Sequence, residues 1–408
     1  MNNPIRLIAK NFTLLSLLKV ILTFMPFIYL PHIINTLGIG FYGKVILALS
    51  LASYFLSFTD FGFNLSATRD IAIHKNSKNQ VNLIINKVLI VKTFLLLTAV
   101  LVYILIITTL PPFSSNKTIY FLILLTLIGN SYFPNWFFLG IENVTIPFVI
   151  NLVTKSLFTL SIFIFIRTED DKVFFPLLIA ISSLLSGVLG MLGMYYYAKF
   201  SFKIPKQKRI REYARGSLHL FYNQLLPNLY NNSSTFILGL IATPEITGGY
   251  GAMRKIFSLF EGHLLILSKV FYPSNIRMKE SFHNYRKVIL IMTVIGLILL
   301  YLMSSYILNI FSIHIEYRHG IFNILLLSSF GFILYNIFGV NYYIANRKDF
   351  IVLKSVILGS IIGFTLMLPM IYFYSALGAS ISILVARSIT SSNLIFKYYY
   401  FNENRHTS

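Results

Sequence analysis

Residues 42–70 show the pattern that organises the chain. They begin in a Gly-rich turn and continue for about the 20 apolar residues that a helix needs to span a bilayer. If the stretch is helical, its polar side chains recur at steps of three and four residues and share one face. These side chains are Ser50, Ser53, Ser57, Asp60 and Asn64. A spanning helix with an acid on a polar face is expected to face other helices or a wet cavity.

The same pattern recurs along the chain and predicts an all-α polytopic membrane protein. About twelve spans are expected, at about 11–34, 44–66, 84–110, 118–140, 147–166, 173–197, 218–241, 250–273, 288–311, 321–345, 352–373 and 377–397. The composition agrees, because 56% of the residues are hydrophobic, 12% are charged and the mean hydropathy is +0.73. A soluble fold could not bury that much apolar surface.

The distribution of cations predicts which side of the membrane each loop occupies. With the N-terminus inside, 22 Lys and Arg residues fall in loops on the cytoplasmic side and 5 on the other side. Because cytoplasmic loops carry the excess of cations, this split predicts two cytoplasmic termini and an even number of spans. The net charge of +21 is therefore interpreted as a sign of topology, and no nucleic-acid partner is expected.

The chain is expected to divide into two six-helix bundles. A loop at 199–217 contains seven cations and a proline, and we interpret it as a basic cytoplasmic linker that lies on anionic lipid. It separates an N-terminal bundle, 1–198, from a C-terminal bundle, 218–408, which ends in a short cytoplasmic tail. The similar short sequences at 41–43 and 249–251 favour a duplicated transporter body.

Polar side chains concentrate in the first two predicted spans of each half. Equivalent helices of a duplicated body would meet across a pseudo-twofold axis, so their polar faces are expected to line one central cavity. The spans contain seven cations and two acids, so this cavity should attract an anion. The cations are Lys19, Lys92, Lys155, Arg254, Lys255, Lys269 and Arg387, and the acids are Asp60 and Glu261.

Several of these charges also have a structural interpretation. Lys92 lies near the end of its span and is expected to snorkel to the surface. Lys155 and Arg387 either snorkel as well or pair inside the protein. Arg254 and Glu261 are seven residues apart on one helix face and could form a structural pair bridged across helices.

Other classes of chemistry find no support in the sequence. The chain contains no cysteine, which excludes disulfides and thiol chemistry, and its eight histidines show no metal-ligand spacing. The triplet at 60–62 matches the magnesium motif of kinases but lacks their catalytic loop, and no phosphate-binding loop is present. We therefore expect neither a metal site nor ATP hydrolysis, and the absence of a sizeable soluble domain argues against an enzyme.

Three segments resemble a known family. They are NTLGIGFYGKV at 35–45, FTDFGFNLSATRDIA at 58–72 and FPNWFFLGIE at 133–142. These segments resemble the polysaccharide transport family of the multidrug/oligosaccharidyl-lipid/polysaccharide (MOP) flippase superfamily, and within it the Wzx-type O-antigen flippases. The resemblance implies two bundles in a V that work by alternating access in the bacterial inner membrane. It also implies a substrate of undecaprenyl diphosphate with an oligosaccharide repeat unit, moved from the cytoplasmic to the periplasmic leaflet.

The resemblance further implies roles for particular residues and several binding partners. Members of the family hold the diphosphate with cavity cations, and the candidates here are Lys19, Arg254 and Lys255. No cofactor is expected, although coupling to H⁺ or Na⁺ is suggested for the superfamily. Membrane lipids, a polysaccharide polymerase and a chain-length regulator are the candidate partners besides the substrate. The remaining candidate residues are Ser53, Ser57, Asn64, Gln224, Asn228 and Asn231 for the glycan, and Asp60 and Glu261 for ion coupling.

Two alternative functions remain open from the sequence. A cation-coupled drug exporter of the same fold would need an acidic cavity, whereas the predicted cavity is basic. A membrane scaffold for a glycan-assembly complex would have no need of Lys19 or Asp60 inside the bilayer.

Overall fold

The described part of the chain is helical and contains no β-strand. The computed structural model describes residues 21–22, 24–143, 145–277, 279–346 and 348–403. Its contacts define two compact units. Unit 1 contains the residues up to Gly38 together with Lys44–Asn232, and unit 2 contains Ile39–Gly43 together with the residues from Ser233 onward. The first turn of α2 therefore packs with unit 2, although the rest of that helix belongs to unit 1.

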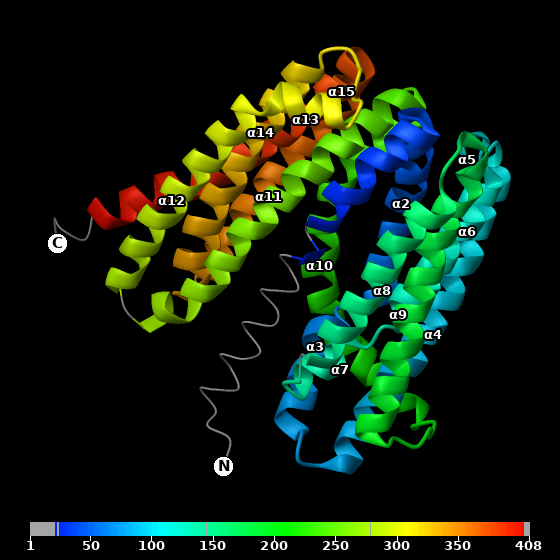
Figure 1. Cartoon of the computed structure of the whole chain (residues 1–408). Helices are drawn as coiled ribbons and strands as arrows, with labels where there is room; N and C mark the ends of the chain where they lie inside the picture. Colours follow the sequence, from blue (N-terminus) through cyan, green and yellow to red (C-terminus); the bar gives the residue numbers. More distant parts are fainter. Residues whose placement is uncertain (1–20, 23, 144, 278, 347, 404–408) are drawn as a thin grey trace. The chain divides into compact units, whose positions relative to one another are not determined.

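Unit 1 contains the helices from α2 to most of α10, shown in blue to green in Figure 1. Residues 24–37 are helical and precede α2. The elements are α2 (Ile39–Asp60), α3 (Phe63–His74), α4 (Lys78–Thr109), α5 (Pro111–Ser114), α6 (Lys117–Tyr132), α7 (Asn135–Gly140), α8 (Thr145–Phe165), η1 (Glu169–Val173), α9 (Phe174–Ala198) and α10 (Gln207–Ile241).

Unit 2 contains the helices from the end of α10 to α15. They are α11 (Pro244–Arg277), α12 (Lys279–Leu302), α13 (Ser304–Ile310), α14 (Arg318–Tyr335), the π-helix η2 (Asn336–Ile344) and α15 (Asp349–Glu403). The π-helix turns Asn341 inward, where its amide donates to the hydroxyls of Ser268 at 2.6 Å and Tyr285 at 3.0 Å. An apolar core from α11, α12, η2 and α15 surrounds these contacts.

Large apolar side chains on the outer faces of the helices fit a lipid environment. Within the described residues, eight helices are long and apolar enough to cross a membrane. Leu101, Leu302 and Phe396 are each about 70% exposed, as expected for side chains that contact lipid (69%, 71% and 71%). One long helix, α15, contains both of the last predicted spans and is interrupted at Ser375, whose φ of 51° is not helical. The total of twelve spans stays a prediction.

The predicted span at 44–66 is not one continuous helix, which corrects the sequence analysis. It breaks into α2 and α3 at Phe61 and Gly62, whose φ values of 45° and 75° are left-handed. Glycine adopts this conformation at little cost, so a glycine at the turn favours the break. The polar face nevertheless continues across the turn, because the amide of Asn64 donates to the carboxylate of Asp60 at 2.7 Å.

The predicted span at 118–140 is also broken, into α6 and α7. Pro134 lies at the break, where it lacks the N–H that a continuing helix would use. The short α7 then packs against α3: Thr68 donates to the carbonyl of Trp136 at 3.1 Å, and a Cβ added at Gly140 would come within 2.7 Å of Ile71. Two of the segments that carry the family resemblance therefore form one buried structural core around Trp136.

The basic segment predicted as a linker at 199–217 is only partly a loop. Residues 200–206 lack regular structure, and α10 already begins at Gln207. Ile210, Tyr213 and Ala214 pack against the apolar core of unit 1. The cations of the same helical turns are exposed: Lys208, Arg209, Arg211 and Arg215. The start of α10 is thus an amphipathic helix that docks on unit 1 and presents a basic face.

Candidate functional site

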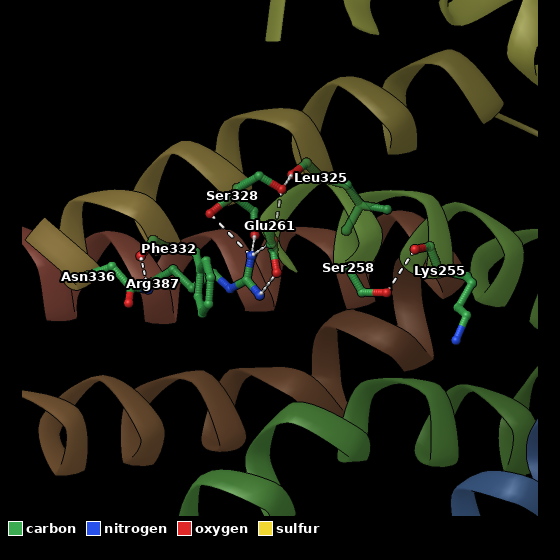
Figure 2. A network of polar contacts seen from close by, with 9 residues as sticks. Lys255, Ser258, Glu261, Leu325, Ser328, Phe332, Asn336 and Arg387 are labelled. Carbon is green, nitrogen blue, oxygen red and sulfur yellow. Dashed lines mark hydrogen bonds and ion pairs between the residues drawn. The ribbon is translucent and has the colours of Figure 1, made fainter. Parts of the chain in front are cut away.

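A buried ion pair in unit 2 joins α11 to α15. Arg387 donates from Nη1 to Oε1 of Glu261 at 2.5 Å and from Nη2 to Oε2 at 3.2 Å, as Figure 2 shows. The two side chains are only 8% and 7% exposed. Two residues of α14 complete the site: Ser329 donates to Glu261 at 2.8 Å, and Arg387 donates to the hydroxyl of Ser328 at 3.1 Å. Such a bidentate, hydrogen-bonded pair is strong and directional.

This ion pair differs from the structural pair that Glu261 could have formed with Arg254. The sequence alone could not identify this partner, because 126 residues separate Glu261 from Arg387. Arg387 follows the second of its two predicted modes and pairs inside the protein, with its guanidinium 4.9 Å above the ring of Phe332. The sequence analysis did not predict a role for Ser328 and Ser329. Their one signal in the sequence is that two serines stand side by side in an apolar span.

Arg254 lies on the same helix, two turns before Glu261. Its Nη1 is buried and has no hydrogen-bond partner among the described residues. Glu261 is close enough to act on it electrostatically, but the carboxylate of Glu261 is already bound to Arg387 and Ser329. A buried N–H of a charged group that lacks a partner is costly, so this guanidinium is a candidate for binding a ligand.

Two buried hydroxyls lie near Arg254, those of Tyr250 and Ser234. Tyr250 precedes Arg254 by one helical turn, and its ring oxygen lies beside Ser234 at the end of α10. Both side chains are fully buried, and apart from their contact with each other neither hydroxyl oxygen has a hydrogen-bond partner in the described part of the chain. We call Ser234, Tyr250 and Arg254 the Arg254 cluster. It offers one guanidinium and two hydroxyls to a polar group that could enter it.

Lys255 differs from Arg254 in its surroundings. Its side chain is exposed, and Figure 2 shows its ammonium pointing away from the pair of Glu261 and Arg387. Its backbone carbonyl accepts the hydroxyl of Ser258 at 2.7 Å. Adjacent positions on a helix are about 100° apart, so two neighbouring cations do not point into the same site.

Unit 1 contains a second acid–cation pair. The ammonium of Lys92 on α4 lies 3.5 Å from the carboxylate of Asp60 at the end of α2. Lys92 is only 5% exposed, so the expectation that it snorkels to the surface was wrong. Asp60 draws it inward, since burial of a lysine requires a partner. Lys155 lies elsewhere in unit 1, with its ammonium 3.4 Å from the hydroxyl of Ser182.

The other predicted residues are distributed over several places. Asn64 joins the pair of Asp60 and Lys92, whereas the hydroxyls of Ser53 and Ser57 donate to backbone carbonyls of α2 at 2.7 Å and 3.0 Å. Lys19 lies outside the described residues. The backbone of α10 includes Gln224, Asn228 and Asn231, but their side chains lie outside the described part of the structure.

Comparison with solved structures identifies the fold. The fold is that of transporters of the MOP superfamily. It is similar to a lipid II flippase, MurJ, in an inward closed conformation, with a TM-score of 0.58 and 15% identity over 93% of this chain and 87% of that one. It is also similar to an outward-facing multidrug resistance MATE family transporter, with a TM-score of 0.51 and 13% identity over 98% and 97% of the two chains.

The sequence places the chain more narrowly. Residues 8–279 match the family described as polysaccharide biosynthesis protein, and the chain belongs to that family. A relative from Escherichia coli strain K12, named "Putative O-antigen transporter", is 23% identical over 383 residues, which cover 91% of this chain and 92% of the relative. The all-α membrane fold and the membership expected from the sequence are thereby confirmed.

Proposed function

We propose that this protein is a flippase for lipid-linked oligosaccharides. Its substrate is undecaprenyl diphosphate with a repeat unit of O-antigen or a similar surface polysaccharide, which it moves from the cytoplasmic to the periplasmic leaflet by alternating access. The relative named as an O-antigen transporter supports this proposal, because the match extends over more than nine-tenths of both chains (91% and 92%). The similarity in fold to a lipid II flippase agrees with a lipid-linked substrate.

The single observation that carries the proposal is the unpartnered Nη1 of Arg254. A diphosphate bears about two negative charges, and removing it from water is costly unless the protein supplies charge and hydrogen bonds. A guanidinium binds phosphate oxygens through charge-assisted, forked hydrogen bonds. Arg254 has a buried N–H to offer, whereas Arg387 is fully engaged by Glu261 and Ser328. The hydroxyls of Tyr250 and Ser234 would add neutral contacts.

The two described span acids argue against a drug exporter for cations. Asp60 is bound to Lys92 and Asn64, and Glu261 is bound to Arg387 and Ser329. A cationic drug would have to displace a resident cation from either one. Both acids remain candidates for coupling to H⁺ or Na⁺. We further propose that Lys19 assists Arg254 at the head group, and that Ser53, Ser57, Asn64, Gln224, Asn228 and Asn231 contact the glycan.

Substitution of Arg254 tests the head-group site. We expect Arg254→Ala to abolish surface polysaccharide while the protein still accumulates in the membrane, because the buried charge that holds the diphosphate is lost. Arg254→Lys should recover part of the export, since it keeps the charge and loses the fork. Surface polysaccharide and membrane protein level are measured together in cells that lack the native gene.

Arg215→Ala is the matched control, because it removes an exposed arginine at the cytoplasmic start of α10. It should export normally. Normal export by Arg254→Ala would contradict the proposed site.

A further inference from the structure

A pocket at one end of unit 2 has no part in the site described above. Its volume is about 490 Å³, which lies in the range of small-molecule sites. Three segments line it: Ile246 at the start of α11, residues 316–321 at the start of α14, and residues 373–377 around the interruption of α15. In Figure 1 the loop that precedes α14 is drawn in yellow and lies beside α15. We call this cavity the bend pocket.

The predicted topology puts the bend pocket on the extracytoplasmic side. Its three lining segments connect predicted spans seven to eight, nine to ten and eleven to twelve. With both termini in the cytoplasm, each of these connections faces outward. A ligand of this pocket would therefore be a molecule that has already reached the outer leaflet, or one that is present outside.

Two polar groups of the bend pocket have no partner within the described residues. The hydroxyl oxygen of Ser375 is buried and forms no hydrogen bond. Glu316 is exposed, and neither a hydrogen bond nor an ion pair is found for its carboxylate in the described part of the chain. Ser375 and Tyr317 also have left-handed φ values of 51° and 54°. Such strain in residues other than glycine is concentrated at functional sites.

Aromatic rings make up much of the remaining wall. Tyr317, Phe373 and Tyr374 line the pocket and are between 56% and 72% exposed, so their faces are available to a ligand. Among the described residues no cation lines it, and Glu316 is the one acid in its wall. The carboxylate disfavours a phosphate, a single carboxylate is too few for a metal ion, and the buried hydroxyl of Ser375 disfavours a purely apolar ligand.

We propose that the bend pocket binds one pyranose unit of the exported glycan. A pyranose has an apolar C–H face that packs on an aromatic ring, and hydroxyls around its edge that donate to a carboxylate and accept from a serine. Glu316 and Ser375 supply these two partners, and Tyr317 or Tyr374 supplies the ring. The proposal rests on the proposed function, since it assigns the pocket to the sugar part of the same substrate after translocation.

The test uses the full-length protein in lipid nanodiscs that contain no glycolipid, because detergents with sugar head groups would compete. The probes are the methyl pyranosides of glucose, galactose and N-acetylglucosamine, and binding is measured by saturation-transfer NMR. We expect at least one probe to bind the unmodified protein. Glu316→Gln and Ser375→Ala should each weaken that binding about tenfold, as expected for loss of a hydrogen bond to a charged or buried group.

Asp170→Asn is the control, because it removes an exposed acid from η1, outside the pocket, and should leave binding unchanged. Equal melting temperatures of the variants show that the fold is intact. Failure of all three probes to bind, equal binding by the variants, or displacement of the sugar by ethanolammonium would each overturn the proposal.

The experiments distinguish an error in the sugar assignment of the bend pocket from an error in the proposed function. If no pyranoside binds while Arg254→Ala still abolishes export, the pocket assignment fails and the flippase stands. If a pyranoside binds with the expected dependence on Glu316 while Arg254→Ala exports normally, the pocket stands as a sugar site and the proposed head-group site fails.

Discussion

At the scale of single residues, each unit contains one acid–cation pair within the described part of its predicted spans, and the two pairs differ in how firmly they are held. Glu261 and Arg387 form a bidentate pair with both side chains less than a tenth exposed (7% and 8%). Asp60 meets Lys92 through a single contact of 3.5 Å and is 22% exposed. The looser and wetter acid can exchange its partner more readily, so Asp60 suits ion coupling better than Glu261 does.

Matched substitutions of the two acids test this difference. We expect Glu261→Gln to lower the stability of the protein by about 3–5 kcal/mol, because it leaves Arg387 buried without its partner. Asp60→Asn should cost less stability and still abolish glycan export, because it removes the negative charge that would bind the coupling ion. Thermal unfolding in nanodiscs and surface polysaccharide measure the two effects. Full export by Asp60→Asn at a normal protein level would remove Asp60 as a coupling site.

At the scale of elements, the break between α2 and α3 decides where the motif side chains lie. Gly62 has a φ of 75°, which a residue with a Cβ adopts only with strain. The break also allows Phe63, Ala67 and Ile71 of α3 to pack with Trp136 in one core. Without the break, residues 63–74 would continue the axis of α2, and these three side chains would not lie against Trp136.

Replacement of Gly62 tests the importance of the break. We expect Gly62→Ala to lower the free energy of unfolding by about 1 kcal/mol, owing to the strained φ. Gly216→Ala is the matched control: this glycine lies inside α10, and a Cβ built there meets no atom within 4 Å. It should leave stability unchanged or raise it by about 0.5–1 kcal/mol, since alanine favours a helix. The idea would be wrong if the two variants melted alike.

At the scale of the whole molecule, the cation distribution sets the expected orientation in the membrane. Reporter fusions after Arg215 and after Ser408 should both report the cytoplasm, because these ends belong to the side with 22 loop cations. A fusion after Asp171 should report the opposite side. The assay compares a phosphatase that is active only outside with a fluorescent protein that folds only inside. An extracytoplasmic C-terminus would contradict both the even number of spans and the assignment of the bend pocket.

The sequence by itself determined the class of fold and much of its helical plan. Apolar runs of bilayer length predict membrane-spanning helices, because a chain in lipid must satisfy its backbone hydrogen bonds internally. The same local pattern predicted that Asp60 and Asn64 share one face, and the hydrogen bond between their side chains agrees with this. Three short segments carried the resemblance to the family, and the family match over residues 8–279 confirms the membership.

Only the tertiary structure decided which charges are paired. Lys92 was expected at the surface and is buried on Asp60, while Glu261 binds Arg387 instead of Arg254. A partner that lies on another helix leaves no periodic signal in the chain, because the register between distant helices is set by packing. The same is true of the buried Nη1 of Arg254, which has no hydrogen-bond partner within the described residues, and of the bend pocket, whose walls come from three separate segments.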